Sequence, residues 1–259
     1  YYFLIICSCK PVNFKIGDGE WFNFNDTTFV AFRKHLNFRN GEFYRYLIVR
    51  DKEGRETEIE SRRMAGMHDP HVAALQYQIT PLNYSEKITI RSGINGDIIN
   101  DGVERYKQLN QQHLRHRQQG YSNSMVWVLV ETTQSGISIA EAANHRIFIN
   151  EQETTVNAQA VVDPAKAYLH FNVHAEAGKP VRLEKMVAIY TSKPDDVADP
   201  LEMALKAAAA NTRYDDLLSE SSKAWAELWD KIDVQIEGNR MDQKLIRLHL
   251  YHLMVSASH

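Results

Sequence analysis

The stretch that decides the fold runs from Ser61 to Asn110: SRRMAGMHDPHVAALQYQITPLNYSEKITIRSGINGDIINDGVERYKQLN. Its first apolar segment, Val72–Thr80, follows the turn residues His68-Asp69-Pro70. After the turn Pro81-Leu82-Asn83, Ile88, Ile90 and Ser92 alternate with more polar residues. Alternation with a period of two, bounded by proline, asparagine and glycine, is typical of β-strands. The segment therefore predicts consecutive strands joined by tight turns.

The same pattern extends in both directions, from the N-terminus to about residue 190. On the N-terminal side, Phe43–Arg50 and Glu56–Glu60 are predicted strands, and Asp51-Lys52-Glu53-Gly54 is the hairpin turn between them. Further strands are predicted at Met125–Thr132, Ile137–Ala142, His145–Asn150, Ala167–Val173 and Val181–Thr191. Short strands at this spacing, with no helical period between them, predict a large antiparallel β-sandwich. The polar and basic segment Val103–Gln119 is predicted to be a loop or short helix that projects from the sheets.

From about Pro194 onward the pattern is helical. Asp199-Pro200-Leu201-Glu202 combines an acidic N-cap, a proline at the first helical position and a glutamate in the first turn. A second helix is predicted from Leu217, Ser221, Trp225, Leu228 and Ile232, which recur at steps of three or four. Gly238 ends this helical region, and a third helix is predicted to start near Asn239.

The third helix has apolar residues on two sides. One side is formed by Met241, Leu245, Leu248 and His252, and the other by Ile246, Leu250, Leu253 and Ala257. A helix on the surface of a protein normally has a single apolar stripe. We therefore expect one side to pack on the preceding helices and the other to pack on further helices of a longer protein.

Composition narrows the class of protein. The 259 residues carry a formal net charge of -3 and are 44% hydrophobic, which is ordinary for a globular protein and argues against nucleic-acid binding. The opening apolar run, Tyr1–Cys7, is far shorter than the ~20 residues that span a bilayer, and we expect a buried strand there. Cys7 and Cys9 are separated by one residue, which suits neither a disulfide nor a complete zinc motif.

Several short motifs, in this order and spacing, resemble the N-terminal domain of glycoside hydrolase family 65, which includes maltose, trehalose, kojibiose and nigerose phosphorylases and some α-glucoside hydrolases. The motifs are Ser61-Arg62-Arg63, His68-Asp69-Pro70-His71, Thr80-Pro81-Leu82-Asn83-Tyr84, Arg91-Ser92-Gly93 with Asn100-Asp101-Gly102-Val103, Ala224-Trp225-Ala226-Glu227-Leu228-Trp229 and Arg247-Leu248-His249-Leu250-Tyr251-His252-Leu253. The resemblance extends from about Val12 to the end of the chain. The glycine-rich opening usual in the family is absent, so the first strands of the sandwich are expected to be missing.

The resemblance implies a mainly β fold, a galactose mutarotase-like supersandwich over residues 1–193. A helical linker would follow over residues 194–238, and residues 239–259 would form the first helix of an (α/α)6 catalytic barrel. It also implies that the catalytic glutamate and the phosphate site lie beyond His259, so that the chain alone has no catalytic residue and is inactive. The parent would be an inverting enzyme that acts on an α-linked glucose disaccharide, with inorganic phosphate as co-substrate in a phosphorylase. A cytoplasmic homodimer with no cofactor, metal, membrane or nucleic-acid partner is expected.

Candidate acids and histidines were compared with the needs of glycoside cleavage, which requires a shielded carboxylic acid. Glu56, Glu58 and Glu60 share one strand face, where a solvated role is favoured. Asp97 and Asp101 lie in a polar bend, where a turn role is favoured over a calcium site.

Two histidine pairs are further candidates for a site. His68 and His71 flank Asp69-Pro70, and a structural role is favoured there over metal binding. His113 and His116 lie among arginines, where an exposed polar loop competes with an anion-attracting face.

The remaining site hypothesis concerns the basic, amide-rich segment. Arg105, Gln108, Gln111 and His113 supply hydrogen-bond donors for sugar hydroxyls, and we expect them at the rim of a substrate pocket in the parent protein. A dimer contact or simple exposure is the competing interpretation. A free-standing carbohydrate-binding module is the alternative function, for which Trp21 is the one suitable stacking residue, since Trp127, Trp225 and Trp229 are expected to be buried.

Overall fold

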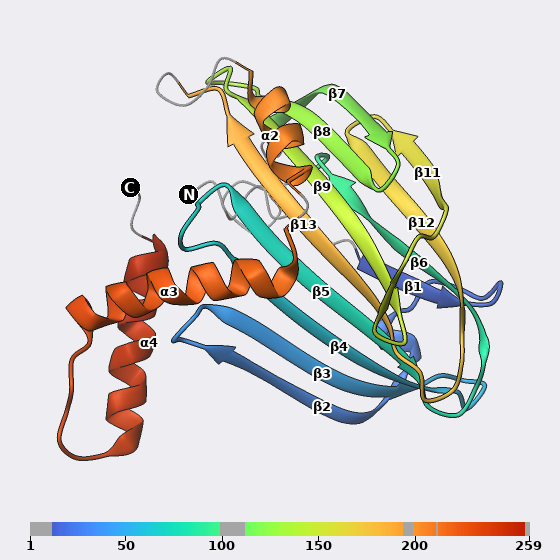
Figure 1. The fold of residues 1–259 in the computed structure, drawn as a ribbon, viewed down its shortest axis with the longest axis horizontal. Coiled ribbons are helices and arrows are strands. Elements are labelled where there is room, and N and C mark those ends of the chain that lie inside the picture. Colours follow the sequence, from blue (N-terminus) through green and yellow to red (C-terminus); the bar gives the residue numbers. More distant parts are fainter. Residues whose placement is uncertain (1–11, 99–111, 194–198, 211, 257–259) are drawn as a thin grey trace.

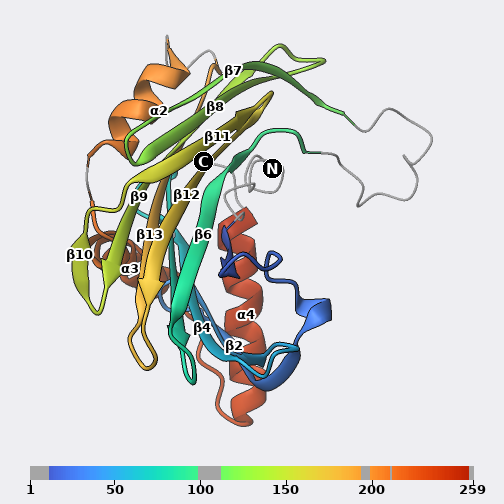
Figure 2. The same cartoon turned by 90° about the vertical axis from the view of Figure 1, so that its right-hand side faces the viewer.

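A computed structural model describes residues 12–98, 112–193, 199–210 and 212–256, and it arranges them as two stacked β-sheets with helices beside them (Figures 1 and 2). The expectations for Tyr1–Cys7, Cys9 and Asp101 lie outside the described residues. The strands are β1 Val12–Ile16, β2 Thr28–Asn37, β3 Glu42–Arg50, β4 Glu56–Ala65, β5 Val72–Pro81, β6 Glu86–Asn95, β7 Leu114–Ser122, β8 Met125–Thr132, β9 Ser138–Ile149, β10 Gln152–Thr154, β11 Ala158–Asp163, β12 Lys166–Ala175 and β13 Val181–Thr191.

All strand pairs are antiparallel, as the turn-separated pattern predicted. The smaller sheet has four strands in the order β1-β6-β12-β11. The larger sheet has nine strands in the order β2-β3-β4-β5-β13-β9-β8-β7, with β10 paired to β9. The predicted turn Pro81-Leu82-Asn83 connects β5 of the larger sheet to β6 of the smaller one, so it joins the two layers of the sandwich. The predicted antiparallel β-sandwich is therefore confirmed.

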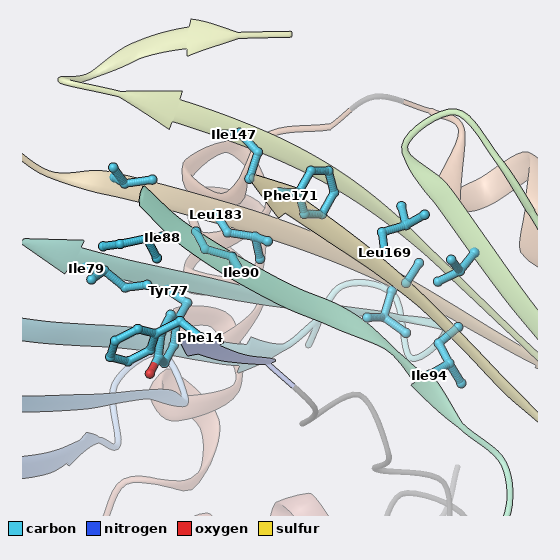
Figure 3. Packing of buried hydrophobic residues seen from close by; sticks show 14 of the residues in the cluster. Phe14, Tyr77, Ile79, Ile88, Ile90, Ile94, Ile147, Leu169, Phe171 and Leu183 are labelled. Atoms are coloured by element: carbon cyan, nitrogen blue, oxygen red, sulfur yellow. The ribbon is translucent and has the colours of Figure 1, made fainter. Parts of the chain in front are cut away.

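The main core lies between the two sheets (Figure 3). Ile88 and Ile90 of β6, with Phe14 of β1, face Ile79 of β5 and Leu183 of β13, and each of these side chains is at most 1% exposed. The residues between them in sequence point outward, because successive side chains of a strand alternate between the faces of a sheet. The alternation predicted from the sequence therefore supplies the inner face of both sheets.

The outer face of the larger sheet is covered in part by helices. A short 3-10 turn, η1 (Phe24–Asp26), precedes β2, and the α-helices are α2 (Pro200–Ala208), α3 (Tyr214–Ile232) and α4 (Arg240–Ser256). α2 packs its small residues Ala204 and Ala208 on Ala140, Ala142 and Ala188 of β9 and β13. Larger side chains, among them Trp127 of β8 and Leu201 and Leu205 of α2, pack around this alanine contact. In Figure 2, α2 lies on the side of the larger sheet that faces away from β6.

The predicted start of α2 is confirmed at atomic detail. The carboxylate of Asp199 accepts hydrogen bonds from the backbone N–H groups of Leu201 and Glu202 at 2.9 and 3.1 Å. The third helix begins at Arg240, one residue after the predicted Asn239. None of these helices, within the part of the chain that the structure describes, combines the length and apolarity needed to cross a bilayer.

Two local predictions were wrong. Of the segment Val103–Gln119, predicted to be a loop or short helix, residues 103–111 lie outside the described residues, and the part from Leu114 onward belongs to the edge strand β7, which pairs with β8. Gly120 makes this pairing possible, because a Cβ there would lie 2.4 Å from the Trp127 ring. The stretches Ile137–Ala142 and His145–Asn150 fall almost entirely within the single strand β9, because Ala143 and Asn144 between them stay paired with both β13 and β8.

Candidate interface carried by the linker helices

Of the four predicted rim residues, His113 alone is among the described residues. Arg105, Gln108 and Gln111 lie outside the described residues. His113 is exposed just before β7, and its carbonyl oxygen accepts a hydrogen bond from the backbone N–H of Thr133 at 2.9 Å. The rim hypothesis therefore stays a prediction.

The second histidine of that segment has a local partner. The side chain of His116 contacts that of Gln119. Its neighbour Arg117 forms a bidentate pair with Glu131 of β8, and both side chains keep substantial exposure. Because Arg117 is already neutralised by Glu131, the described part of this segment presents less free positive charge than its sequence suggests.

The three glutamates of β4 have structural partners on β3. Glu58 accepts a hydrogen bond from Tyr46 Oη at 2.8 Å, and Glu60 accepts one from Tyr44 Oη at 3.0 Å. Glu56 pairs with the guanidinium of Arg50 at 2.5 Å. Burial, together with the bond to Glu60, raises the pKa of Tyr44 to about 12. The face predicted to be solvated is thus half-buried, and the repulsion expected along it is relieved by cross-strand partners.

The other predicted acid and histidine positions are turn residues. The carboxylate of Asp69 accepts a hydrogen bond from the backbone N–H of His71 at 2.8 Å, and the His71 ring stacks on Tyr190 with centroids 4.1 Å apart. Asp97 forms an ion pair with Lys166 at 3.1 Å. Among the residues that the structure describes, no group of three or more histidines, cysteines or carboxylates is placed to hold a metal ion.

A closed ring of hydrogen bonds fixes the start of α3 to the outer face of the larger sheet. Glu42 accepts from Arg62 Nε at 2.7 Å and from Tyr214 Oη at 3.0 Å. Arg62 Nη1 donates to Gln76 at 3.2 Å, and Gln76 Nε2 donates to Glu184 at 3.0 Å. Glu184 accepts from the backbone N–H of Tyr214 at 3.4 Å, which closes the ring.

The electrostatics of this ring favour a fixed position for the helix. Tyr214 has no exposed surface, and burial together with the nearby charge of Glu42 raises its pKa, so that its hydroxyl keeps its proton and donates. Burial alone would lower the pKa of Arg62, but Glu42 and Tyr214 reverse that effect and raise it. The carboxylate of Glu184 lies at the positive N-terminal end of α3, where the side chain of Arg213 forms no cap.

An aromatic cluster joins α3 and α4 to the β2–β3 turn, at the left of Figure 1. The rings of Trp225 and Tyr251 stack with centroids 5.1 Å apart, and Tyr251 lies 5.8 Å from Phe38. Trp229 Nε1 donates to the Phe38 carbonyl oxygen at 2.8 Å. Gly41 has φ +71° and leaves room for the indole, since a Cβ there would lie 3.0 Å from Trp225 Nε1. The cluster therefore needs both the left-handed backbone and the small size of Gly41.

The face of α4 away from this cluster is uncovered in the structure. Met241, Leu245, Leu253 and Val255 are between 45% and 62% exposed, and no residue of α4 is buried. The covered side is formed by half-buried residues such as Ile246 and Tyr251. The two predicted sides are only partly separated in the structure, since Met241 and Leu245 of one side are exposed together with Leu253 of the other, while Leu248 is half-buried with Ile246 and Leu250.

The tryptophans do not form a flat, open platform. Trp225 is 2% exposed, and Trp229 and Trp127 are half-buried, the latter against α2. The guanidinium carbon of Arg91 lies 4.4 Å from the Trp21 ring centroid and covers the ring surface that a sugar would need. The predicted burial is thus confirmed for Trp225 and is only partial for Trp127 and Trp229.

The hydrogen-bonded ring around Tyr214 escaped prediction from the sequence. Glu42 and Tyr214 are separated by 172 residues, and no spacing rule relates them. The available signals were Arg62 within the motif Ser61-Arg62-Arg63 and a tyrosine at the first position of a helix without a polar N-cap. Neither signal identifies its partner.

The fold and this interface define a class: a large antiparallel β-sandwich that carries α-helices on the outer face of its larger sheet. The model of "Glycosyl hydrolase family 65, N-terminal domain" matches residues 4–228, and the chain belongs to this family. The resemblance stated from the short motifs is therefore confirmed.

Similar proteins are larger than this chain. An uncharacterized glycosyl hydrolase of Mycobacterium tuberculosis is 32% identical over 247 residues, which are 95% of this chain and 19% of that protein. A kojibiose phosphorylase of Halothermothrix orenii is 30% identical over 246 residues, which are 92% of this chain and 31% of the relative. A solved structure described as "Putative kojibiose phosphorylase from human microbiome" superposes with a TM-score of 0.79 at 16% identity. It covers 94% of this chain and 30% of the other, and it shows the same fold.

Proposed function

We propose that this chain is the N-terminal, non-catalytic part of an α-glucoside phosphorylase or hydrolase that acts on a disaccharide such as maltose, trehalose or kojibiose. The family assignment supports the class of parent protein, and the names of the relatives include phosphorylases of kojibiose and α,α-trehalose. The chain spans between about a fifth and a third of those relatives. In this proposal the catalytic acid lies in the remaining part and, in a phosphorylase, inorganic phosphate is the co-substrate.

The observation that carries the proposal is the uncovered apolar face of α4. In the proposed parent, residues 1–193 form the sandwich, residues 194–238 the linker and residues 239–259 the first helix of the catalytic barrel. The next helices of the barrel would cover Met241, Leu245 and Leu253. Full burial of one such side chain contributes roughly 1.5–3 kcal/mol, so a continuous face of this kind would hold the two domains together firmly.

The test compares one substitution in two lengths of protein. Leu245→Lys should lower the thermal stability of the full-length protein, because it would place a charge in the domain interface, and should leave the 259-residue chain almost unchanged. Leu82→Lys is the matched control, because Leu82 is a 37% exposed leucine in the turn between β5 and β6. If Leu245→Lys and Leu82→Lys affect the full-length protein equally, α4 does not contact the catalytic part as proposed.

The segment before β7 is proposed to shape the rim of the substrate pocket in the parent. Its support is chemical, because Arg105, Gln108, Gln111 and His113 are hydrogen-bond donors that suit sugar hydroxyls. Arg105→Ala and Gln111→Ala in the full-length protein should raise KM for the disaccharide with little change in stability. Unchanged KM values in both variants would remove this part of the proposal.

A cytoplasmic homodimer is the proposed state of the parent, on the basis of the family resemblance. Light scattering coupled to size-exclusion chromatography would measure its mass. A monomeric full-length protein at micromolar concentration would contradict the proposed assembly.

A free-standing carbohydrate-binding module is the alternative function. It would require an open aromatic platform, whereas Trp21 lies against Arg91. Tryptophan fluorescence measured with maltose, trehalose and kojibiose separates the two functions. A saturable response would favour the module, and its absence would favour the accessory domain.

A further inference from the structure

Three nitrogen bases surround one indole ring on the outer face of the smaller sheet. Lys15 on β1, Arg91 on β6 and His170 on β12 belong to neighbouring strands (Figure 1). Arg91 and His170 are directly opposite each other in the register of β6 and β12. All three alternate with buried core residues, so their side chains leave the sheet on the face turned away from the core.

The indole is that of Trp21, and the distances are short. The Arg91 guanidinium carbon lies 4.4 Å from the Trp21 ring centroid, and Lys15 Nζ lies 5.8 Å from it. The rings of Trp21 and His170 have centroids 5.4 Å apart. Tyr168 bounds the other side, 5.6 Å from the Arg91 guanidinium carbon. We call these five residues the cation–indole cluster.

The charge of the cluster is not balanced by an ion pair with any carboxylate among the described residues. Within the described ranges, no ion pair joins Lys15 or Arg91 to an acid, and Arg91 Nε is buried with no hydrogen-bond partner. Burial and the charges of Arg91 and Lys15 lower the pKa of His170. Two acids near this sheet have other partners, since Asp97 pairs with Lys166 and Glu176 pairs with Lys179, whereas the charge of Asp163 on β11 contributes to the raised pKa of Tyr168.

We propose that the cation–indole cluster binds a phosphate group, either as inorganic phosphate or as the phosphoryl group of a hexose phosphate. A tetrahedral dianion would relieve the repulsion between Lys15 and Arg91 and would give the Arg91 Nε–H an acceptor. A guanidinium matches such an anion with two parallel N–H donors. Trp21 and Tyr168 are both half-buried, and their surface not covered by Arg91 would bound a sugar ring attached to the phosphate. This site is independent of the function proposed above.

The ring of His170 provides a direct readout. In the 259-residue chain with labelled histidine, NMR titration with inorganic phosphate at constant ionic strength should move the His170 resonances and raise its pKa. His174, four residues further along β12 and on the same face, is the internal reference and should not respond. A shift of His170 that sodium chloride reproduces at equal ionic strength would overturn the proposal.

A substitution tests the role of the guanidinium. Arg91→Gln should weaken phosphate binding at least tenfold, which corresponds to about 1.4 kcal/mol. Arg33→Gln, an exposed arginine on β2, is the matched control and should bind normally. Equal affinity in Arg91→Gln and the native chain would overturn the proposal. Should Arg91→Gln fail to fold, Lys15→Gln gives the same comparison.

The two sources of phosphate are separated by a parallel titration. A hexose 6-phosphate that binds at least tenfold more tightly than inorganic phosphate, with a change in Trp21 fluorescence that Trp21→Phe abolishes, identifies the sugar ester as the ligand. Equal affinities identify inorganic phosphate. Binding of neither compound at millimolar concentration would overturn the assignment.

Discussion

Lowering the pH from about 7.5 to about 5 should destabilise the sandwich through one buried histidine, His145 of β9. This side chain is 3% exposed. Its Nδ1 lies 2.8 Å from the carbonyl oxygen of Ser124, which can only accept, so Nδ1 carries the proton. Nε2 then accepts from Ser92 Oγ at 2.9 Å, and the ring is neutral. Burial, and after it the charge of Lys185, lower the pKa of His145 from 6.5 to about 3.

The sign and size of the effect follow from proton linkage. Below its ordinary pKa of 6.5, His145 is protonated in the unfolded chain but stays neutral in the folded chain until the pH approaches 3. Acid therefore favours the unfolded state, and the stability that is complete above about pH 7.5 is lost progressively as the pH falls through 6.5. Integrating this difference in bound protons from about pH 7.5 to about pH 5 gives a loss of about 2 kcal/mol.

The assay is urea unfolding, followed by circular dichroism, of the native chain and of His145→Gln at a series of pH values between about 5 and 7.5. Other titrating groups act equally in both proteins, so the difference between their free energies of unfolding isolates His145. That difference should shrink by about 2 kcal/mol at the acid end. His174→Gln, at an exposed position of β12, should run parallel to the native chain. Parallel curves for His145→Gln would refute the reasoning.

Three further substitutions probe how the helices α2 and α3 are held to the sandwich. Tyr214→Phe removes the hydrogen bond to Glu42 and should lower the free energy of unfolding, measured in urea, by about 1.5–3 kcal/mol. The loss should exceed that of Tyr46→Phe, which removes a bond to Glu58 at a half-exposed site. Equal losses would contradict the idea that the hydrogen-bonded ring around Tyr214 anchors α3. Asp199→Ala removes the N-cap of α2 and should lower the free energy of unfolding by about 1 kcal/mol, whereas Asp199→Asn keeps a capping oxygen and should retain most of that stability. Equal melting temperatures for the two variants would show that the cap contributes little. Gly41→Val should lower Tm clearly, because a β-branched side chain is strained at the positive φ of residue 41 and would clash with the Trp225 ring. An unchanged Tm would mean that the aromatic cluster can move aside.

The features predicted correctly from sequence depend on neighbours in the chain. Alternation along Val72–Thr80 marks a strand because a strand exposes every second residue to the core. Asp199-Pro200 marks a helix start because the capping carboxylate reaches N–H groups only two and three residues away. The apolar character of α4 on more than one side was visible for the same reason, since a helical period of 3.6 residues fixes which residues share a face.

The features that escaped prediction depend on residues far apart in sequence. Leu114–Ser122 is polar enough to be read as a loop, and it becomes a strand because it pairs with β8 and because Gly120 fits against Trp127. The ring around Tyr214 and the cation–indole cluster bring together side chains from three or more elements. Which rim residues meet a substrate stays a prediction, because Arg105, Gln108 and Gln111 lie outside the described residues.

The sequence by itself determined the β-then-α order, the turn and cap positions and the membership in a family of carbohydrate-active proteins. The tertiary structure alone decided the strand order, the side of α4 that is covered and the partners of Glu42, Arg62 and Arg91. The physical reason is that local periodicity and capping act over a few residues, whereas strand pairing and side-chain networks are chosen by contacts that only the assembled sheets create.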